Sequence, residues 1–390
     1  MISVEEALSA LFALASPLDT EVVPLSEANG RVLAAPLTAK RNQPPFAASA
    51  MDGYAIFGDA AAPGDSFEVI GEAAAGHGFN GTLSEGQACR IFTGAPLPAG
   101  AGRVIIQEDV ERDNARIILA EKLDPNLYIR PAGADFKAGD TFSAPRALRP
   151  SDIALLASMN HASVPVTRKP VVAIIATGDE LVQPGETPNQ DQIIASNSYG
   201  LATLVNANGG HARILPIAKD NLPSLKLAFD LALDADLIVT IGGASVGDHD
   251  LVAEAAANLG MARSFYKIAM RPGKPLMAGR LGRSMMIGLP GNPVSAMVCG
   301  HIFVLPVLRK MLGLGAAAAP RQNAIVAKDI PVNGPREHYM RGRIENGQVT
   351  TFERQDSALL TVLSDANCLC VRPPKAPLTA AGETVEVVLI

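Results

Sequence analysis

The alternation of apolar and polar positions in the second half of the chain predicts a parallel sheet flanked by helices. Short β-branched runs alternate there with stretches of helical periodicity. In chain order these runs are residues 171–176, 198–207, 212–217, 222–233 and 236–241. Parallel neighbours need a crossover connection, which is commonly a helix. We therefore expect a doubly wound α/β domain over residues 169–316.

The first half of the chain has a different pattern. Residues 4–15 have helical spacing and stop before Pro17, as helices do. Residues 44–149 are dense in glycine and proline with short β-rich pieces, which is typical of a small β-domain. Helical spacing returns at residues 150–159, with Ser151 as a plausible N-cap. We expect this second helix to pack against the first.

These patterns predict an organisation into four units. They are a helical linking unit of residues 1–43 plus 137–168, a small β-rich domain of 44–136, the parallel-sheet domain of 169–316 and a C-terminal β-domain of 321–390. The small-residue stretch 313–320 has the composition of a linker. The expected fold class is thus multidomain α/β plus β, with β-rich domains on either side of a doubly wound parallel sheet.

Composition and charge narrow the class of protein. The 390 residues are 48% hydrophobic and 18% charged, which argues against disorder. No apolar run comes near the roughly 20 residues that span a bilayer, and the acidic start does not resemble a signal peptide. The net charge of −6 disfavours nucleic-acid binding. We expect a cytoplasmic protein with no membrane and no nucleic-acid partner.

Four cysteines are too few for a disulfide framework in a chain of this length. Cys368 and Cys370 alternate as in a strand, so both thiols face one side, where core packing is the simpler interpretation. The chain lacks the paired Cys-x-x-Cys and His-Glu-x-x-His spacings that structural and catalytic zinc sites use.

Glycine-rich segments follow two of the expected strands. The run 236–241 leads directly into Gly242, Gly243, Ser245, Gly247, Asp248 and Asp250, and residues 285–289 lead into Pro290, Gly291, Asn292 and Pro293. Ligands of open parallel sheets bind beyond the carboxyl ends of the strands, where glycine lets backbone N–H groups approach an anion. Two such loops predict a site for an extended phosphorylated ligand.

Acidic residues occur in similar loop contexts. They are Asp52, Asp135, Asp179, Glu180, Asp248 and Asp250. Mg²⁺ prefers carboxylate and phosphate oxygens and needs one or two protein acids. Glu180 and Asp250 follow neighbouring strands of the expected sheet, so we predict that they hold the metal. The alternative for any single acid is a turn-forming or helix-capping role.

A basic turn brings Lys267, Arg271 and Lys274 within eight residues around a Pro-Gly pair. These cations could neutralise a phosphate or another oxyanion, and a solvated basic face is the alternative. The segment is not a P-loop, because Pro275 follows Lys274 where a serine or threonine is required.

The pattern Gly-x-Ser-x-Gly at residues 243–247 also matches the nucleophile elbow of α/β-hydrolases. A hydrolase would need an acid and a histidine downstream of Ser245. His301 falls in an expected helix and His338 beyond the linker, and we expect His249 to support the site indirectly. A serine hydrolase is therefore the least favoured alternative.

Taken in order, six strings resemble the molybdopterin molybdenumtransferase family, known as MoeA in bacteria and as the E domain of gephyrin in animals. They are Ser49-Ala-Met-Asp-Gly-Tyr-Ala55, Ile91-Phe-Thr-Gly-Ala-Pro-Leu-Pro98, Ala176-Thr-Gly-Asp-Glu-Leu181, Gly242-Gly-Ala-Ser-Val-Gly247, Met270-Arg-Pro-Gly-Lys-Pro275 and Leu289-Pro-Gly-Asn-Pro-Val-Ser295. The resemblance covers nearly the whole chain. It implies Mg²⁺-assisted ligation of molybdate into adenylylated molybdopterin with release of AMP.

The resemblance also implies residue roles. Catalytic roles fall on Asp52, Thr93, Asp135, Lys267 and Lys274, and metal binding on Glu180 and Asp250. Pterin and phosphate binding fall on Thr177, Gly178, Gly242, Gly243, Ser245, Gly247, Asp248, Arg271, Pro290, Gly291, Asn292, Pro293 and Arg341. Arg271 stands where some members carry lysine, and arginine is a planar, bidentate donor.

The family further implies an elongated subunit that forms a homodimer, with the active cleft between the β-domain of one subunit and the pterin-binding domain of the other. A molybdopterin adenylyltransferase, molybdoenzymes or their chaperones are the implied docking partners. Two alternatives remain besides the hydrolase. A pterin adenylyltransferase shares the sheet domain but needs no extra β-domains, and a pterin-binding scaffold would need none of the acids.

Overall fold

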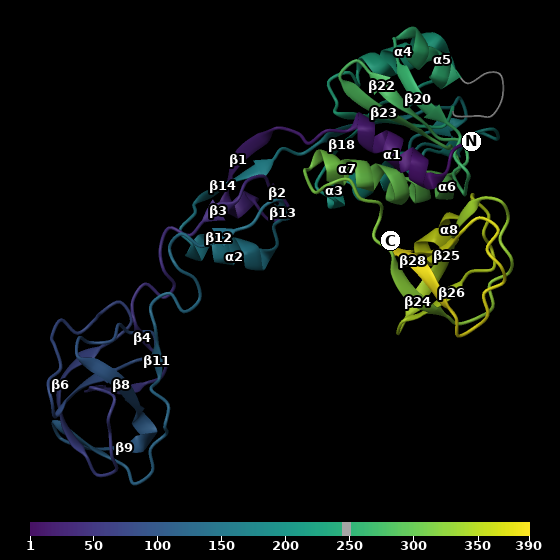
Figure 1. Cartoon of the computed structure of the whole chain (residues 1–390). Coiled ribbons are helices and arrows are strands. Elements are labelled where there is room, and N and C mark those ends of the chain that lie inside the picture. Colours follow the sequence, from purple (N-terminus) through teal and green to yellow (C-terminus); the bar gives the residue numbers. More distant parts are fainter. Residues whose placement is uncertain (244–250) are drawn as a thin grey trace.

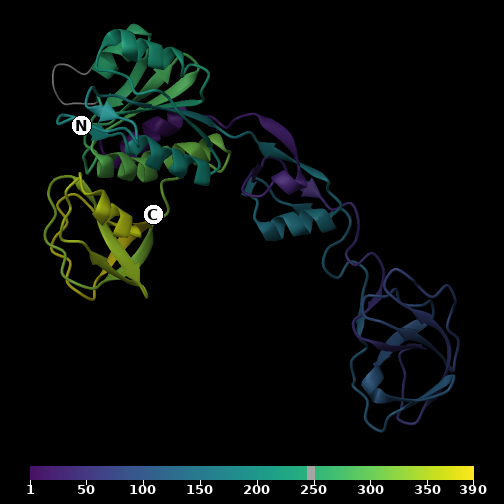
Figure 2. The same cartoon turned by 180° about the vertical axis from the view of Figure 1, so that it is seen from behind.

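The computed structural model describes residues 1–243 and 251–390. The chain is elongated (Figure 1): the parallel-sheet domain and the C-terminal domain lie at one end, a small sheet unit follows, and a β-domain lies at the other end. The same separation is visible from behind (Figure 2). The subunit is therefore a string of units and not one compact body.

A six-stranded sheet forms the central domain, in the order β18-β15-β19-β23-β22-β20. The strands are β15 (Val171–Ala176), β18 (His211–Ile214), β19 (Leu237–Ile241), β20 (Ala262–Tyr266), β22 (Met277–Leu281) and β23 (Ser284–Leu289). The first four strands in the order are parallel, and β22 pairs antiparallel with both β23 and β20, so β22 is the strand that runs in the opposite direction. A tight connection at Gly282, with φ of 57°, joins β22 to β23 and forces that reversal. The expected doubly wound sheet thus carries an antiparallel edge.

Helices cover both faces of this sheet. The alternation of side chains along β15 places Val172 and Ile174 in one apolar core and Ala173 and Ile175 in the other. The first core packs against α3 (Asn197–Ala207), α6 (Pro293–Cys299), the π-helix η3 (Gly300–Val304) and α7 (Leu305–Met311), and the second against α4 (Leu222–Asp230) and α5 (Leu251–Asn258). The expected strand 212–217 ends earlier, at Ile214, two residues before Pro216.

The first helix, α1 (Val4–Leu14), has the expected position in the sequence and an unexpected place in the fold. A capping box between Ser3 and Glu6 starts it. Its buried residues join the core of the parallel-sheet domain, so its grouping with residues 137–168 and its packing on the second helix are both wrong. That second helix, α2 (Pro150–Ser158), is preceded by Arg149 at the N-cap position and not by Ser151, and it packs in a separate core.

Segments far apart in the sequence build the small sheet unit. Its order is β1-β14-β2-β13, from β1 (Thr20–Pro24), β2 (Val32–Leu33), β13 (Arg146–Ala147) and β14 (Ser163–Thr167). A second pair joins β3 (Leu37–Thr38) to β12 (Thr141–Phe142). The β-domain is inserted between these halves, so two chain segments connect it to the rest of the subunit.

The inserted β-domain has a six-stranded sheet in the order β8-β5-β7-β6-β10-β9. Its strands are β5 (Gly53–Phe57), β6 (Ser66–Ala73), β7 (Gln87–Ile91), β8 (Ala101–Ile106), β9 (Val110–Asp113) and β10 (Arg116–Leu119), with β4 (Ala48–Ser49) and β11 (Ile129–Arg130) paired beside them. Two small cores lie on its faces, which agrees with the alternating pattern of a half-buried strand.

The C-terminal domain is a β-sheet with one helix, α8 (Leu360–Asp365). Its strands are β24 (Gln322–Val326), β25 (Glu337–Glu345), β26 (Gln348–Thr351), β27 (Cys368–Arg372) and β28 (Thr384–Leu389). The short strand β21 (Met270–Arg271) of the basic turn joins this sheet beside β25. Cys368 and Cys370 are buried in one core as predicted.

The run from Pro293 to Met311 corrects the expectation about apolar stretches. Its 19 residues form a continuous helical segment that is long and apolar enough to cross a bilayer, yet 72% of an apolar 18-residue stretch within it is buried inside the protein. Its side chains fill the core beneath the parallel sheet. Burial in that core accounts for its apolar composition without a membrane.

Candidate functional site

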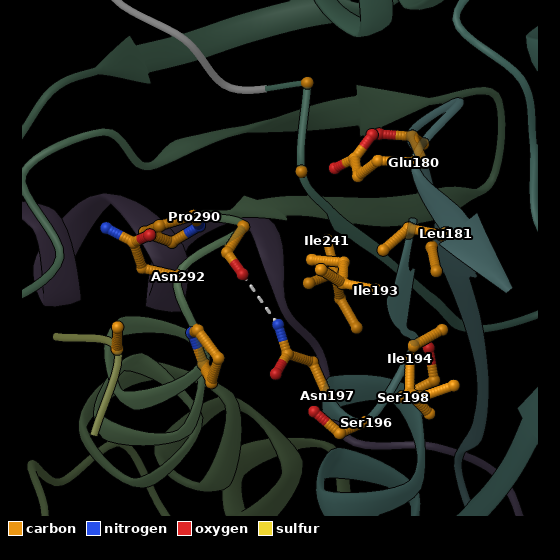
Figure 3. A pocket seen from close by; sticks show the side chains of 18 of the residues that line it. Glu180, Leu181, Ile193, Ile194, Ser196, Asn197, Ser198, Ile241, Pro290 and Asn292 are labelled. Carbon is orange, nitrogen blue, oxygen red and sulfur yellow. Dashed lines mark hydrogen bonds between the residues drawn. The ribbon is translucent and has the colours of Figure 1, made fainter. Parts of the chain in front are cut away.

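A cavity of about 610 Å³ opens at the carboxyl ends of β15, β19 and β23 (Figure 3). This volume is typical of sites for small molecules. Eight of the sequence-predicted residues line it: Thr177, Glu180, Gly242, Gly243, Pro290, Gly291, Asn292 and Pro293. The strand-end reasoning is confirmed in that these loops meet at one place.

Two glycines at the end of β19 have a geometry that other residues do not fit. Gly242 and Gly243 have φ of 94° and 66°, values that L side chains rarely adopt. A Cβ on Gly242 would lie 2.6 Å from the Thr177 carbonyl oxygen, and one on Gly243 would lie 2.1 Å from Cγ2 of Val252. The chain thus needs glycine here to bring the backbone to the cavity wall.

The loop after β23 is fixed from two sides. The Asn197 amide nitrogen in α3 donates to the Gly291 carbonyl at 2.8 Å, a bond drawn in Figure 3. The Asn292 amide nitrogen donates to the Ser357 hydroxyl of the C-terminal domain at 3.0 Å. Pro293 then opens α6 at its first helical position. The C-terminal domain therefore helps to hold one wall of the cavity.

Acidic side chains gather at the opposite wall. Glu180 and Asp220 both line the cavity, and the Asp179 carboxylate accepts a hydrogen bond from the Asp220 N–H at 3.2 Å. Partial burial, with the charges of Asp179 and Glu180, raises the pKa of Asp220. The sequence reasoning missed Asp220, which lies in no motif; its position between a strand and a helix was the available signal.

The described residues contain no group of three histidine, cysteine, aspartate or glutamate side chains arranged to hold a metal. Asp250, the second predicted metal ligand, lies outside the described residues, as do Ser245, Gly247, Asp248 and His249. The hydrolase alternative gains nothing from the rest of the site, because His301 and His338 do not line this cavity.

The basic turn lies beside the cavity, which Pro275 helps to line. The turn is closed by a hydrogen bond from the Ile268 N–H to the Lys274 carbonyl at 2.9 Å. The ammonium of Lys267 stands over the Tyr266 ring, 4.9 Å from its centre. Arg271 is exposed and pairs in register with His338.

The lowered pKa of His338 reflects both its burial and the positive charge around it. Burial first, then the charges of Arg271, Arg341, Arg336 and Arg372, lowers its pKa to about 4, so its imidazole is neutral near pH 7. Cations from the basic turn and from the C-terminal sheet therefore concentrate where the two domains meet.

Arg341 differs from its predicted role. The residue is 1% exposed, its Nε and Nη2 donate to Gln355 Oε1, and its Nη1 donates to the Asp356 carbonyl at 2.7 Å. Its guanidinium is thus used inside the C-terminal domain and does not line the cavity. The structure contradicts direct contact between Arg341 and a pterin ligand in that cavity.

Three of the predicted residues, Asp52, Thr93 and Asp135, belong to the β-domain. Asp52 accepts hydrogen bonds from the backbone and the hydroxyl of Thr93. Asp135 lines a cavity of about 710 Å³ in the β-domain, together with Arg41 and Arg130. This domain lies at the far end of the subunit from the first cavity (Figure 1), so one chain does not bring the two sets of residues together.

Comparison with known proteins agrees with this architecture. Family models described as "MoeA N-terminal region (domain I and II)", "Probable molybdopterin binding domain" and "MoeA C-terminal region (domain IV)" match residues 2–160, 173–310 and 323–390. A solved structure of the molybdopterin biosynthesis protein MoeA from Pyrococcus horikoshii superposes over 100% of both chains, with a TM-score of 0.86 and 29% identity. These matches define the class: a multidomain protein of molybdenum cofactor biosynthesis.

Curated relatives give the family. The chain is 36% identical to the molybdopterin molybdenumtransferase of Nostoc sp., over 99% of this chain and 93% of that one. It is 34% identical to that of Haemophilus influenzae, over 99% and 98%. The chain belongs to the molybdopterin molybdenumtransferase family, whose members are transferases.

Proposed function

We propose that this protein inserts molybdate into adenylylated molybdopterin and releases AMP, which completes the molybdenum cofactor. The observation that carries the proposal is the cavity at the strand ends, where glycine loops, two carboxylates and an adjoining basic turn meet. Such a site fits a ligand that combines a ring system with phosphates.

The reaction breaks the anhydride bond between the pterin phosphate and AMP. Charge neutralisation and positioning contribute more to such a step than a protein nucleophile does. Lys267, Arg271 and Lys274 would bind the phosphate or molybdate oxygens, and the Gly242–Gly243 backbone would let a phosphate approach. Thr177, whose hydroxyl is buried without a partner among the described residues, can hydrogen-bond the ligand.

The donor set fits Mg²⁺. Glu180 and Asp220 supply carboxylates at the cavity wall. Burial first, and then the charges of Asp179 and Glu180, raises the pKa of Asp220, and a cation would relieve the repulsion between these like charges. A bound Mg²⁺ would neutralise phosphate charge as the anhydride breaks. Asp250 remains a predicted ligand.

We further propose that the active site is completed by the β-domain of a second subunit, because the β-domain, which carries Asp52, Thr93 and Asp135, lies at the far end of the subunit from the parallel-sheet domain (Figure 2). A cytoplasmic location and docking of an adenylyltransferase or of molybdoenzymes and their chaperones remain predictions.

The decisive assay incubates the protein with adenylylated molybdopterin, molybdate and Mg²⁺. We expect molybdate-dependent AMP release and reconstitution of a cofactor-free molybdoenzyme. Binding without AMP release would instead support a scaffold, and ATP consumption would support an adenylyltransferase.

A mixed-subunit experiment tests the shared site. Asp52→Asn and Glu180→Gln chains are each expected to be inactive alone. Coexpressed with different tags and purified as the mixed dimer, they should regain activity, because one of the two sites then has both intact residues. An inactive mixed dimer that is correctly folded would refute the shared site.

A further inference from the structure

A second cavity, of about 410 Å³, adjoins the first. It is an open cavity bordered by α3, by α6 with η3, and by the α8 region of the C-terminal domain, and its lining residues are Ser196, Asn197, Gly200, Met297, His301, Leu360, Leu363, Ser364, Ala366 and Ile390. Ser196 and Asn197 also line the first cavity. None of the described side chains that line the second cavity is an aspartate, glutamate, lysine or arginine.

His301 is presented to this cavity by an irregular stretch of helix. Residues Gly300–Val304 form a π-helix within the otherwise α-helical run from Pro293 to Met311, and such bulges are frequent at functional sites. Burial lowers the pKa of His301 to about 4, so its imidazole is neutral near pH 7 and offers one donor and one acceptor. The imidazole nitrogens of His301 have no hydrogen-bond partner within residues 1–243 and 251–390.

Asn197 contributes a second polar group. Its amide nitrogen is committed to the Gly291 carbonyl, which fixes the orientation of the side chain. Its oxygen is on the other side of the amide (Figure 3) and is buried without a partner in the described part of the chain. A buried acceptor without a partner is unfavourable, so a ligand donor that reaches it would be favourable.

From this geometry we propose that the second cavity is a binding site for a small uncharged molecule, separate from the catalytic cavity. The ligand has an apolar body that contacts Met297, Leu360 and Leu363, and one N–H or O–H group that donates to Asn197 or His301. A charged ligand would find no counter-charge among the described side chains around it. The volume lies within the range of small-molecule pockets.

Indole is a suitable probe, since it is uncharged, apolar and carries one N–H donor. The chain contains no tryptophan, so the emission of bound indole can be followed directly in a titration of the full-length protein. We expect saturable binding, and 1-methylindole, which lacks the donor, should bind at least about fivefold more weakly.

Two variants locate the site. Ala366→Phe fills the cavity from α8 and should reduce indole binding at least about tenfold while leaving AMP release unchanged. Ala317→Phe, on the exposed stretch before β24, is the matched control and should bind indole normally. AMP, which belongs in the first cavity, should not displace the probe.

The proposal is overturned if indole shows no saturable binding, if both indoles bind equally, if Ala366→Phe binds like the wild type, or if AMP displaces indole. Circular dichroism of Ala366→Phe shows whether that variant is folded. Should it not fold, Ser364→Leu provides the same test. The indole-binding readouts do not require turnover, so failure of the proposed function would leave them interpretable.

Discussion

Asp52 and Thr93 form a closed pair: one carboxylate oxygen of Asp52 accepts both the backbone N–H and the hydroxyl of Thr93, each at 2.7 Å. The side-chain hydrogen bond first, and then the backbone one, lowers the pKa of Asp52. Asp52 lies in the turn before β5 and Thr93 follows β7, and these strands are direct neighbours. The sheet therefore brings together two residues that the sequence separates.

This pair predicts a shift in pH dependence. Thr93→Val removes the hydroxyl, so the pKa of Asp52 rises toward its ordinary value and the acidic limb of the rate profile moves to higher pH. Thr93→Ser keeps a hydroxyl and should leave the limb nearly unchanged. Because the ordinary pKa of aspartate is about 3.9, AMP release measured from about pH 2.5 to about pH 6 would check this, and coincident acidic limbs for all three proteins would contradict it.

The surroundings of two cavity glycines predict that alanine at Gly243 is more harmful than alanine at Gly291. Gly243→Ala places a methyl group 2.1 Å from Val252 at φ of 66°, which should lower the melting temperature and weaken pterin nucleotide binding at least about tenfold. Gly291→Ala meets its nearest heavy atom at 3.5 Å and should change stability by less than about 0.5 kcal/mol. Calorimetry and a binding titration would check both, and equal effects would refute the steric argument.

The buried hydrogen bonds of Arg341 predict that its substitution lowers the stability of the C-terminal domain and does not act directly on the reaction. Arg341→Met removes the buried donors to Gln355 and Asp356, which should destabilise the C-terminal domain by about 1–3 kcal/mol. Arg343→Met, at an exposed position on the same strand, is the control and should be near neutral. Hydrogen exchange of β25 would measure the difference. Unchanged protection in Arg341→Met would contradict the structural role.

The contacts of Asp152 predict that its substitution lowers the stability of the protein by an amount that depends on pH. It is 3% exposed, accepts from Arg146 at 2.6 Å and from the Arg149 N–H at 2.9 Å. Burial acts to raise its pKa, but the Arg149 hydrogen bond and the Arg146 charge outweigh it, and the pKa is lowered. Asp152→Asn should cost about 1–3 kcal/mol near pH 7.

The sign of that effect follows from the lowered pKa. The stabilisation is fully present above the unfolded pKa of about 3.9 and is lost as pH falls through the lower folded pKa. Urea denaturation should therefore show a constant gap between wild type and Asp152→Asn above about pH 5, and a smaller one near pH 3. A stability difference between wild type and Asp152→Asn that persists unchanged to pH 3 would contradict stabilisation by the ionised carboxylate of Asp152.

The local elements and the residues of the loops could be predicted from the amino-acid sequence alone. Strand and helix periods predicted β15, β19, α3 and α4 within a few residues, because side-chain alternation and helical spacing are written directly in the chain. The glycine loops after β19 and β23 were predicted for a second reason: a parallel sheet places the carboxyl ends of its strands at one edge.

Which segments share a core could not be predicted from the sequence, because it depends on packing in the folded protein. The apolar face of α1 fits either neighbour, and packing placed it on the parallel sheet and not on α2. Asp220 lines the acidic wall of the cavity, whereas Arg341 lies in the interior of the C-terminal domain. Both positions result from contacts between residues distant in sequence. Such contacts depend on the complementary shapes of folded surfaces, which a pattern of residue types along one chain does not encode.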